Sequence, residues 1–194
     1  MRQIKHTEVG GLREEKSALV DSESKLVLRP LREEDIPSIV AIDESISGRA
    51  KPEYWHHKLT HYLSENKFDS DDETRFLAQV AEIDGKVVGF MIGGIRRWEF
   101  GEPSCGWITA LGIDPNHRHL GIARRLLAEV LDYYRQNGLE HVRTIVERSE
   151  GDLLKFFHSM GFIRGPFVEL QKWLNLPAET GPQGTESGAS GGRP

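Results

Sequence analysis

The chain has 194 residues, a length that suits one domain with tails, and its 38% hydrophobic and 28% charged residues are typical of a soluble globular protein. A formal net charge of −5 argues against nucleic acid as the main partner, and no apolar run approaches the roughly 20 residues of a membrane helix. The single cysteine, Cys105, permits no internal disulfide, so the composition fits a reducing cytoplasm.

The first 24 residues are polar and lack the hydrophobic stretch of a secretory signal, and we expect a flexible N-terminal arm there. The folded domain is predicted to span residues 25–176. It opens with a strand over residues 25–29 and a helix whose first turn is acidic, at Glu33, Glu34 and Asp35.

A second helix is predicted over residues 52–66, after a loop that contains Gly48. His57, His61 and Glu65 lie one turn apart on that helix, a spacing that some metal sites use. No fourth ligand and no His-Glu-x-x-His pattern accompanies them, so we expect a solvated face and no metal.

A β-hairpin follows an acidic loop at residues 68–73, which we expect to be a solvated surface loop. Alternating apolar residues predict strands over residues 75–83 and 86–98, and the Asp84-Gly85 pair between them is a strong tight-turn signal. Glycines interrupt the second strand and predict a bulge or a close backbone approach there: Gly89, Gly93 and Gly94.

The central strand of the chain leads into a turn and a glycine-containing loop. Period-two spacing predicts a strand with four residues on one side: Trp107, Thr109, Leu111 and Ile113. Asp114-Pro115-Asn116 then ends the strand, because proline lacks a ladder donor and Asp and Asn favour turns. From Ile122 the apolar residues recur at helical spacing, which predicts an amphipathic helix.

Gly121 stands where this amphipathic helix begins. The first amides of a helix have no intrahelical acceptor, and the helix dipole places partial positive charge there. A glycine lets a phosphate approach these amides closely, and Arg118, Arg124 and Arg125 add positive charge. The residues therefore predict an anion-binding loop after a strand, suited to a phosphorylated cofactor.

Beyond that helix the pattern predicts a strand over residues 141–147, parallel to the central strand because a helix connects the two. A further helix is predicted over residues 149–161, and the last strands over residues 162–174. From residue 177 to residue 194 the chain holds five glycines and three prolines and no aromatic residue, so we expect a disordered tail.

The spacing Arg118-x-x-Gly121-x-Ala123, after a strand and before an amphipathic helix, resembles the coenzyme A loop of the GCN5-related N-acetyltransferase (GNAT) family. The opening Val27-Leu28-Arg29-Pro30 and the late Phe156-Phe157-His158-Ser159-Met160-Gly161-Phe162 extend the resemblance over about residues 25–174. It implies an α/β (α+β) fold with a mixed, mostly antiparallel sheet of about seven strands, a parallel splayed central pair, and about four flanking helices.

The resemblance also implies a site. Acetyl-coenzyme A would lie along the central strand and its loop, with Phe157 beside the thioester; the other binding residues would be Leu111, Gly112, Ile113, Arg118, His119, Leu120, Gly121, Ile122, Ala123 and Arg124. A backbone amide near Leu111 or Ile113 would stabilise the oxyanion. Gly48, Arg49 and Trp55 would set acceptor specificity, although the aromatic residues of that helix also fit packing on the sheet.

Two positions depart from the family pattern. Phe157 stands where many members have a tyrosine that protonates the leaving thiolate, and Trp107 stands where many have a glutamate base. Glu147 is the replacement base that we expect, with an exposed or salt-bridged surface acid as the alternative interpretation. Ser159 and its neighbour His158 are candidate acids; both also fit the outer face of their helix, and water is a third proton source.

The implied activity is transfer of an acetyl group from acetyl-coenzyme A to a primary amine by direct attack in a ternary complex. A protein or peptide amine is slightly favoured, because the final helix and strands loosely resemble enzymes that acetylate protein N-termini or lysines; small-molecule amines are the alternative. Loss of the tyrosine keeps open a second class, an acetyl-coenzyme A-binding sensor or interaction module without catalysis. We expect a cytoplasmic monomer or homodimer that contacts neither nucleic acid nor membrane.

Overall fold

The computed structural model describes residues 26–65, 74–97 and 104–174. The predicted N-terminal arm, the acidic loop at residues 68–73 and the C-terminal tail lie outside these ranges. Within them, every helix is too short or too polar to cross a membrane.

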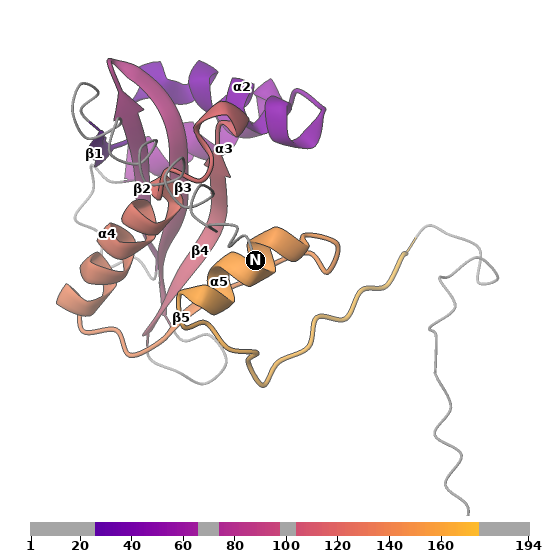
Figure 1. Cartoon of the computed structure of the whole chain (residues 1–194). Helices are drawn as coiled ribbons and strands as arrows, with labels where there is room; N and C mark the ends of the chain where they lie inside the picture. The colour runs from indigo at the N-terminus through magenta and orange to yellow at the C-terminus, as the bar shows by residue number, and fades with distance from the viewer. Residues whose placement is uncertain (1–25, 66–73, 98–103, 175–194) are drawn as a thin grey trace, which may run out of the picture.

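The described strands form one mixed sheet in the order β1-β2-β3-β4-β5 (Figure 1). They are β1 (Val27–Pro30), β2 (Thr74–Ile83), β3 (Lys86–Arg97), β4 (Ser104–Ile113) and β5 (Val142–Thr144). The first four pair antiparallel, and β5 pairs parallel to β4, as the connecting helix predicts. The predicted hairpin is confirmed, because Asp84 (φ 50°) and Gly85 (φ 75°) form a left-handed two-residue turn between β2 and β3.

Helices cover both faces of this sheet (Figure 1). The helices α2 (Ile36–Ser47) and α3 (Pro52–Glu65) lie on one face, where Ile39 and Leu59 are fully buried. The helix α4 (Ile122–Gln136) lies on the opposite face through Leu126 and Tyr134, and α5 (Gly151–Ser159) joins that core through Phe157. Single 3₁₀ turns precede α2 and α4: η1 (Glu33–Asp35) and η2 (Pro115–His117).

The sheet has five described strands rather than about seven, and the prediction of strands over residues 162–174 is wrong. That segment has no strand pairing, and its large apolar side chains are exposed: Ile163, Phe167, Val168, Leu170, Trp173 and Leu174. Strand β5 is also shorter than the predicted 141–147, since only three of its residues pair with β4. A strand needs a neighbouring edge for its backbone donors and acceptors, and alternation alone does not supply one.

A β-bulge interrupts the pairing of β3 with β4. Ile92 pairs with Ala110, but the next residue, Gly93, pairs with Ile108, so Thr109 is the extra residue in β4. The glycines of β3 therefore mark a register shift, as the sequence predicts, although the extra residue lies on the partner strand.

The bulge makes one prediction wrong, namely that Trp107, Thr109, Leu111 and Ile113 share one side of β4. Before the bulge Ile108 packs in the α4-face core, so Trp107 lies on the opposite side. After the bulge Leu111 and Ile113 pack against the α4-face core instead. Because of this one extra residue, the even-numbered residues of β4 face α4 before the bulge and the odd-numbered residues face it after the bulge.

Candidate functional site

The bulge also changes which backbone groups of β4 face away from β3. Before it, the Gly106 amide donates to the carbonyl of His141, 2.9 Å away, on the β5 side. After it, the Asp114 amide donates to the carbonyl of Val88, 2.9 Å away, on the hairpin side. Successive residues of a strand alternate in direction, so the amides of Leu111 and Ile113 point away from β3.

These two amides lie on an edge of β4 that has no neighbouring strand. Pairing with β5 ends at the Ile108–Thr144 pair, whereas β4 continues to Ile113. In the ranges that the structure describes, no strand lies beside β4 past that point. A preorganised backbone amide on such an edge is the kind of donor that stabilises an oxyanion.

The loop after β4 is shaped by Asp114. Its carboxylate accepts hydrogen bonds from the backbone amide (2.9 Å) and the side-chain amide (3.1 Å) of Asn116, and it lies 3.2 Å from Nδ1 of His117. These contacts, led by the bond from the Asn116 backbone amide, lower the pKa of the Asp114 carboxyl. Asp114 therefore fixes where the strand ends and the loop begins.

Two residues of the loop adopt left-handed backbone, His119 (φ 66°) and Gly121 (φ 77°). A Cβ added to Gly121 would meet nothing within 4 Å, so the backbone angle and not packing requires a glycine here. The amide of Arg125 donates to the carbonyl of Gly121, 3.1 Å away. The amides of residues 122–124 precede that first turn and have no intrahelical acceptor.

We call residues 118–124 the anion cradle. Arg118, His119 and Arg124 are exposed there, and the sequence has no acidic residue between Asp114 and Glu129. Open space over Gly121, unpaired helix amides and nearby arginines together fit a phosphate or pyrophosphate group. The anion-binding loop stays a prediction, and these features support it.

Other residues predicted to bind the cofactor are buried or partly buried. Ile122 is 2% exposed and anchors α4 in the core, while Leu120 and Ala123 are partly buried. A Cβ added to Gly112 would come within 2.5 Å of the Phe90 ring, so this glycine allows close packing inside the sheet. Ile122 and Gly112 thus support the cradle and the strand before it through packing.

The residues considered for proton transfer lie after β5. Phe157 is buried against Phe156 and Phe162, and its ring has no proton to donate. The hydroxyl of Ser159 is exposed and donates to the carbonyl of Phe156 in its own helix (2.7 Å). Glu147 is exposed, and its carboxylate accepts a hydrogen bond from the Ser149 hydroxyl (2.7 Å).

The residues considered for acceptor recognition separate into two kinds. Gly48 ends α2 in left-handed backbone (φ 69°), and it is exposed together with Arg49. Trp55 is 4% exposed; its indole nitrogen donates to Asp43 (2.8 Å), and its ring packs edge-on against Phe90. Trp55 is therefore a core residue between helix and sheet, which is the packing alternative considered for it.

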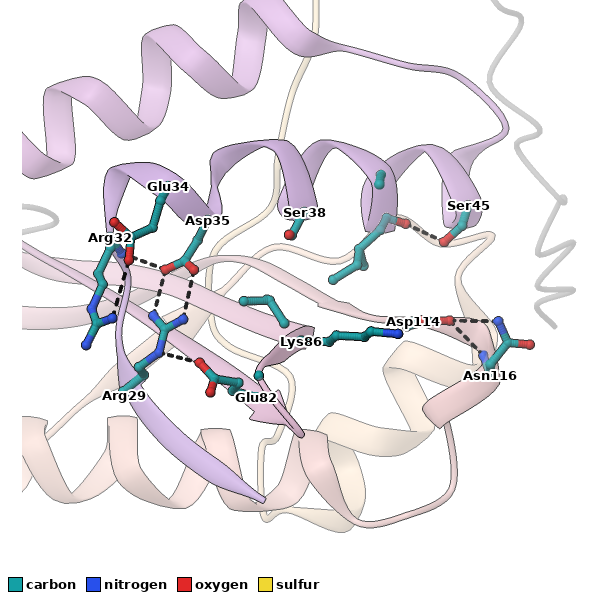
Figure 2. Close-up of a pocket in the computed structure, with 14 residues that line it drawn as sticks. Arg29, Arg32, Glu34, Asp35, Ser38, Ser45, Glu82, Lys86, Asp114 and Asn116 are labelled. Carbon is teal, nitrogen blue, oxygen red and sulfur yellow. Dashed lines mark hydrogen bonds and ion pairs between the residues drawn. The ribbon is translucent and has the colours of Figure 1, made fainter. Parts of the chain in front are cut away.

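A polar groove of about 690 Å³ lies between α2, β1, the β2–β3 turn and η2 (Figure 2). Its main feature, a cluster of ion pairs, was not predicted from the sequence. Arg29 donates hydrogen bonds to both carboxylate oxygens of buried Asp35 (2.7 and 2.8 Å) and to the carboxylate of Glu82 (2.8 Å). Burial raises the pKa of the Asp35 carboxyl, but the bonds from Arg29 and from the Arg32 amide outweigh it, and the pKa is lowered. These charges satisfy one another, and the groove includes no cradle residue, so we assign it no ligand.

No group of three or more His, Cys, Asp or Glu side chains in the described ranges is arranged to hold a metal ion. The structure does not describe the side chains of His61 and Glu65, so the predicted solvated face of α3 stays a prediction.

Comparison with known sequences gives a match to the family described as "Acetyltransferase (GNAT) family" over residues 41–162. The mycothiol acetyltransferase of Thermomonospora curvata is 33% identical over 86 residues, which cover 44% of this chain and 27% of that protein. The mycothiol acetyltransferase of Rhodococcus jostii is 27% identical over 157 residues, which cover 70% of this chain and 51% of that protein. The chain thus spans about a quarter to a half of these curated relatives.

Solved structures share the fold at low sequence identity. The aminoglycoside N-acetyltransferase AAC(6')-Iy in complex with CoA superposes with a TM-score of 0.65 at 15% identity, covering 78% of this chain and 96% of that one. The ribosomal-protein-alanine N-acetyltransferase of Brucella melitensis gives a TM-score of 0.60 at 18% identity, covering 76% and 99%. Identities this low bear on the fold and not on the acceptor.

Proposed function

The chain belongs to the GNAT acetyltransferase family, and from that premise we propose that it transfers an acetyl group from acetyl-coenzyme A to a primary amine. One observation carries the proposal. A single strand–loop–helix unit carries the proposed anion cradle at residues 118–124 and, just before it, the amides of Leu111 and Ile113 on the edge of β4 that has no neighbouring strand in the described ranges. The phosphates and the thioester of one extended donor would then lie on the same unit.

The reaction proceeds by direct attack in a ternary complex. The neutral amine attacks the thioester carbonyl carbon, a C–N bond forms, the C–S bond breaks, and one proton passes from the amine to the thiolate. The Leu111 amide stabilises the oxyanion, and removal of one such donor typically costs about 10²–10³ in rate. The cradle holds the phosphates, so that positioning lowers the barrier as well.

Glu147 is the base that we propose, acting through water because its carboxylate is exposed. The amine must lose a proton, since an alkyl ammonium has a pKa near ~10. Water is the proposed proton source for the leaving thiolate. The hydroxyl of Ser159 already donates within its own helix, which weakens its candidacy as the acid, and Phe157 has no proton to give.

For the acceptor we propose a primary amine on a small molecule. The name of the curated relatives, mycothiol acetyltransferase, supports this class. The slight preference for a protein or peptide amine gains no support from the curated relatives. The exposed Gly48–Arg49 segment is the proposed contact for this acceptor.

A second function, binding of acetyl-coenzyme A without turnover, is favoured by one observation: a buried phenylalanine, Phe157, stands at the position of the family's proton-donating tyrosine. Release of free thiol from acetyl-coenzyme A, measured with a panel of aminoglycosides, amino sugars, polyamines and peptides, separates the two functions. We expect turnover with at least one small amine. Micromolar binding of coenzyme A with no thiol release on any amine would identify a binding module instead.

A further inference from the structure

Tyr134 inserts its hydroxyl between two strands of the sheet. The side chain projects from α4, and the residue is 1% exposed. Its oxygen accepts a hydrogen bond from the backbone amide of Gly94 on β3 (3.0 Å) and donates one to the carbonyl of Trp107 on β4 (2.7 Å). These two residues lie directly opposite each other in the β3–β4 pairing. The hydroxyl thus stands where a regular ladder would join strand to strand.

The surrounding glycines make room for this insertion. A Cβ added to Gly93 would lie 2.5 Å from the Tyr134 hydroxyl and would also collide with the Trp107 carbonyl. A Cβ added to Gly106 would lie 2.8 Å from the tyrosine ring. Two glycines on neighbouring strands therefore face one tyrosine, and any other residue at either position would displace it.

The insertion lies immediately before the bulge. Thr109, the bulged residue, donates from its hydroxyl to the carbonyl of Ile92 (3.3 Å) and lies 3.4 Å from the hydroxyl of Tyr62 on α3. Tyr134 and Tyr62, which lie on opposite faces of the sheet, thus contact β4 at Trp107 and at Thr109. The side-chain alternation of β4 reverses at the second of these residues.

We propose that Tyr134 is a positioning residue for catalysis: its hydroxyl fixes where β4 enters the bulge and thereby aims the Leu111 amide at the thioester carbonyl. This inference rests on the proposed acetyl transfer. On β4 the hydroxyl holds Trp107, two residues before Thr109, and the amide of Leu111, two residues beyond Thr109, is the proposed oxyanion donor. Rotation of the peptide at Thr109 would turn that amide out of line.

Tyr134 is not a substitute for the tyrosine acid of the family. Its proton is engaged by the Trp107 carbonyl, and the side chain is buried in the sheet–helix core. Burial also raises the pKa of this hydroxyl, so it stays a donor throughout the pH range of the reaction. Its effect on the reaction passes through the strand, and no step requires it to release the proton.

The test is Tyr134→Phe, which removes one oxygen and keeps the ring. Tyr133→Phe, on the same helix but only partly buried, is the matched control. Turnover is measured by thiol release and normalised to the coenzyme A sites counted by calorimetric titration, so that loss of folded protein does not count as loss of catalysis. We expect kcat to fall about 10- to 100-fold, because small misplacements of reacting groups cost that much, while KM for acetyl-coenzyme A and Kd for coenzyme A stay within about twofold.

A second variant, Thr109→Val, loosens the bulge from its exposed side and keeps the test valid if Tyr134→Phe does not fold. We expect kcat to fall several-fold, while Kd for coenzyme A again stays within about twofold. A normalised kcat within twofold of the parent in both variants, or parallel changes in kcat and coenzyme A affinity, would overturn the positioning role alone. Absence of turnover by the parent chain on every amine would overturn the proposed function and this inference with it.

Discussion

The part of the molecule proposed to bind the donor and the part that follows it differ in how firmly they are held. Strand β4, the cradle and α4 rest on fully buried side chains such as Leu126 and Leu127, and long hydrogen-bonded ladders position them. Among the described residues after α4, Phe157 is the one buried apolar side chain, β5 has three paired residues, and residues 163–174 are exposed.

This difference separates two tasks. The proposed coenzyme A recognition and the proposed oxyanion contact depend on backbone geometry, and the buried half supplies it. The candidate proton-transfer groups, Glu147 and Ser159, belong to the exposed part, where water has access. We therefore expect substitutions in the first half to have large effects and substitutions in the second half to have small ones.

The largest effect is expected from Leu126→Ala, compared with Leu170→Ala. Leu126 is 0% exposed and Leu170 is 91% exposed, so the same truncation leaves a cavity in one place and changes only hydration in the other. We expect a loss of about 3 kcal/mol in the free energy of unfolding for Leu126→Ala and less than about 0.5 kcal/mol for Leu170→Ala. Denaturant unfolding measures both, and equal losses would show that the exposed segment is packed in solution.

Next in size is the effect of Gly121→Val on donor binding. Valine is strained at φ 77°, and its side chain fills the space over the cradle. We expect Kd for coenzyme A to rise about 30-fold, equivalent to about 2 kcal/mol. Gly138→Val is the control, because Gly138 has similar left-handed backbone (φ 74°) and open surroundings at the other end of α4. An unchanged Kd for Gly121→Val, or an equal rise for both variants, would remove the cradle assignment.

A smaller effect is expected from Glu147→Gln in the exposed part. The variant should lower kcat/KM about tenfold near pH 6.5 and less near pH 9, because free amine is scarce at the lower pH and a base is then most needed. The exposed Glu150→Gln serves as the control. A pH–rate profile that coincides with that of the parent chain would exclude Glu147 as the base.

The smallest effect is expected from Ser159→Ala. Its hydroxyl donates to the Phe156 carbonyl, so its loss should change kcat by less than about twofold. Steady-state thiol release measures this. A tenfold fall in kcat for Ser159→Ala would instead identify Ser159 as the acid and show that the helix turns it toward the donor.

The sequence predicts elements whose signals are local. The Asp84-Gly85 turn needs only its own backbone angles, and the period of α4 follows from residues one turn apart. The start of α4 after Gly121 is predicted for the same reason, and the structure places this glycine directly before the helix in left-handed backbone. The family resemblance, which rests on these local signals, agrees with the match over residues 41–162.

Predictions that depended on distant partners were less accurate. Thr109 gives no sign of an extra residue, because a bulge is defined by the pairing strand. The hydroxyl of Tyr134 bonds to Trp107 and Gly94, which lie 27 and 40 positions earlier in the chain. In the sequence, only the glycines of β3 indicated a close approach there. The alternation in residues 162–174 looks like a strand, but pairing depends on an edge that the segment itself does not contain.

The bulge at Thr109 shifts the side-chain alternation of β4 by one residue. Upstream of it the even-numbered residues face α4, and downstream the odd-numbered residues do. A substitution along β4 changes one contact. Deletion of Thr109 would remove the bulge and leave Ile108 and Ala110 on their present, opposite faces, whereas deletion of a residue away from the bulge, such as Trp107, would move part of the strand's side chains to the wrong face. Away from the bulge, the length of this strand is therefore as constrained as its composition.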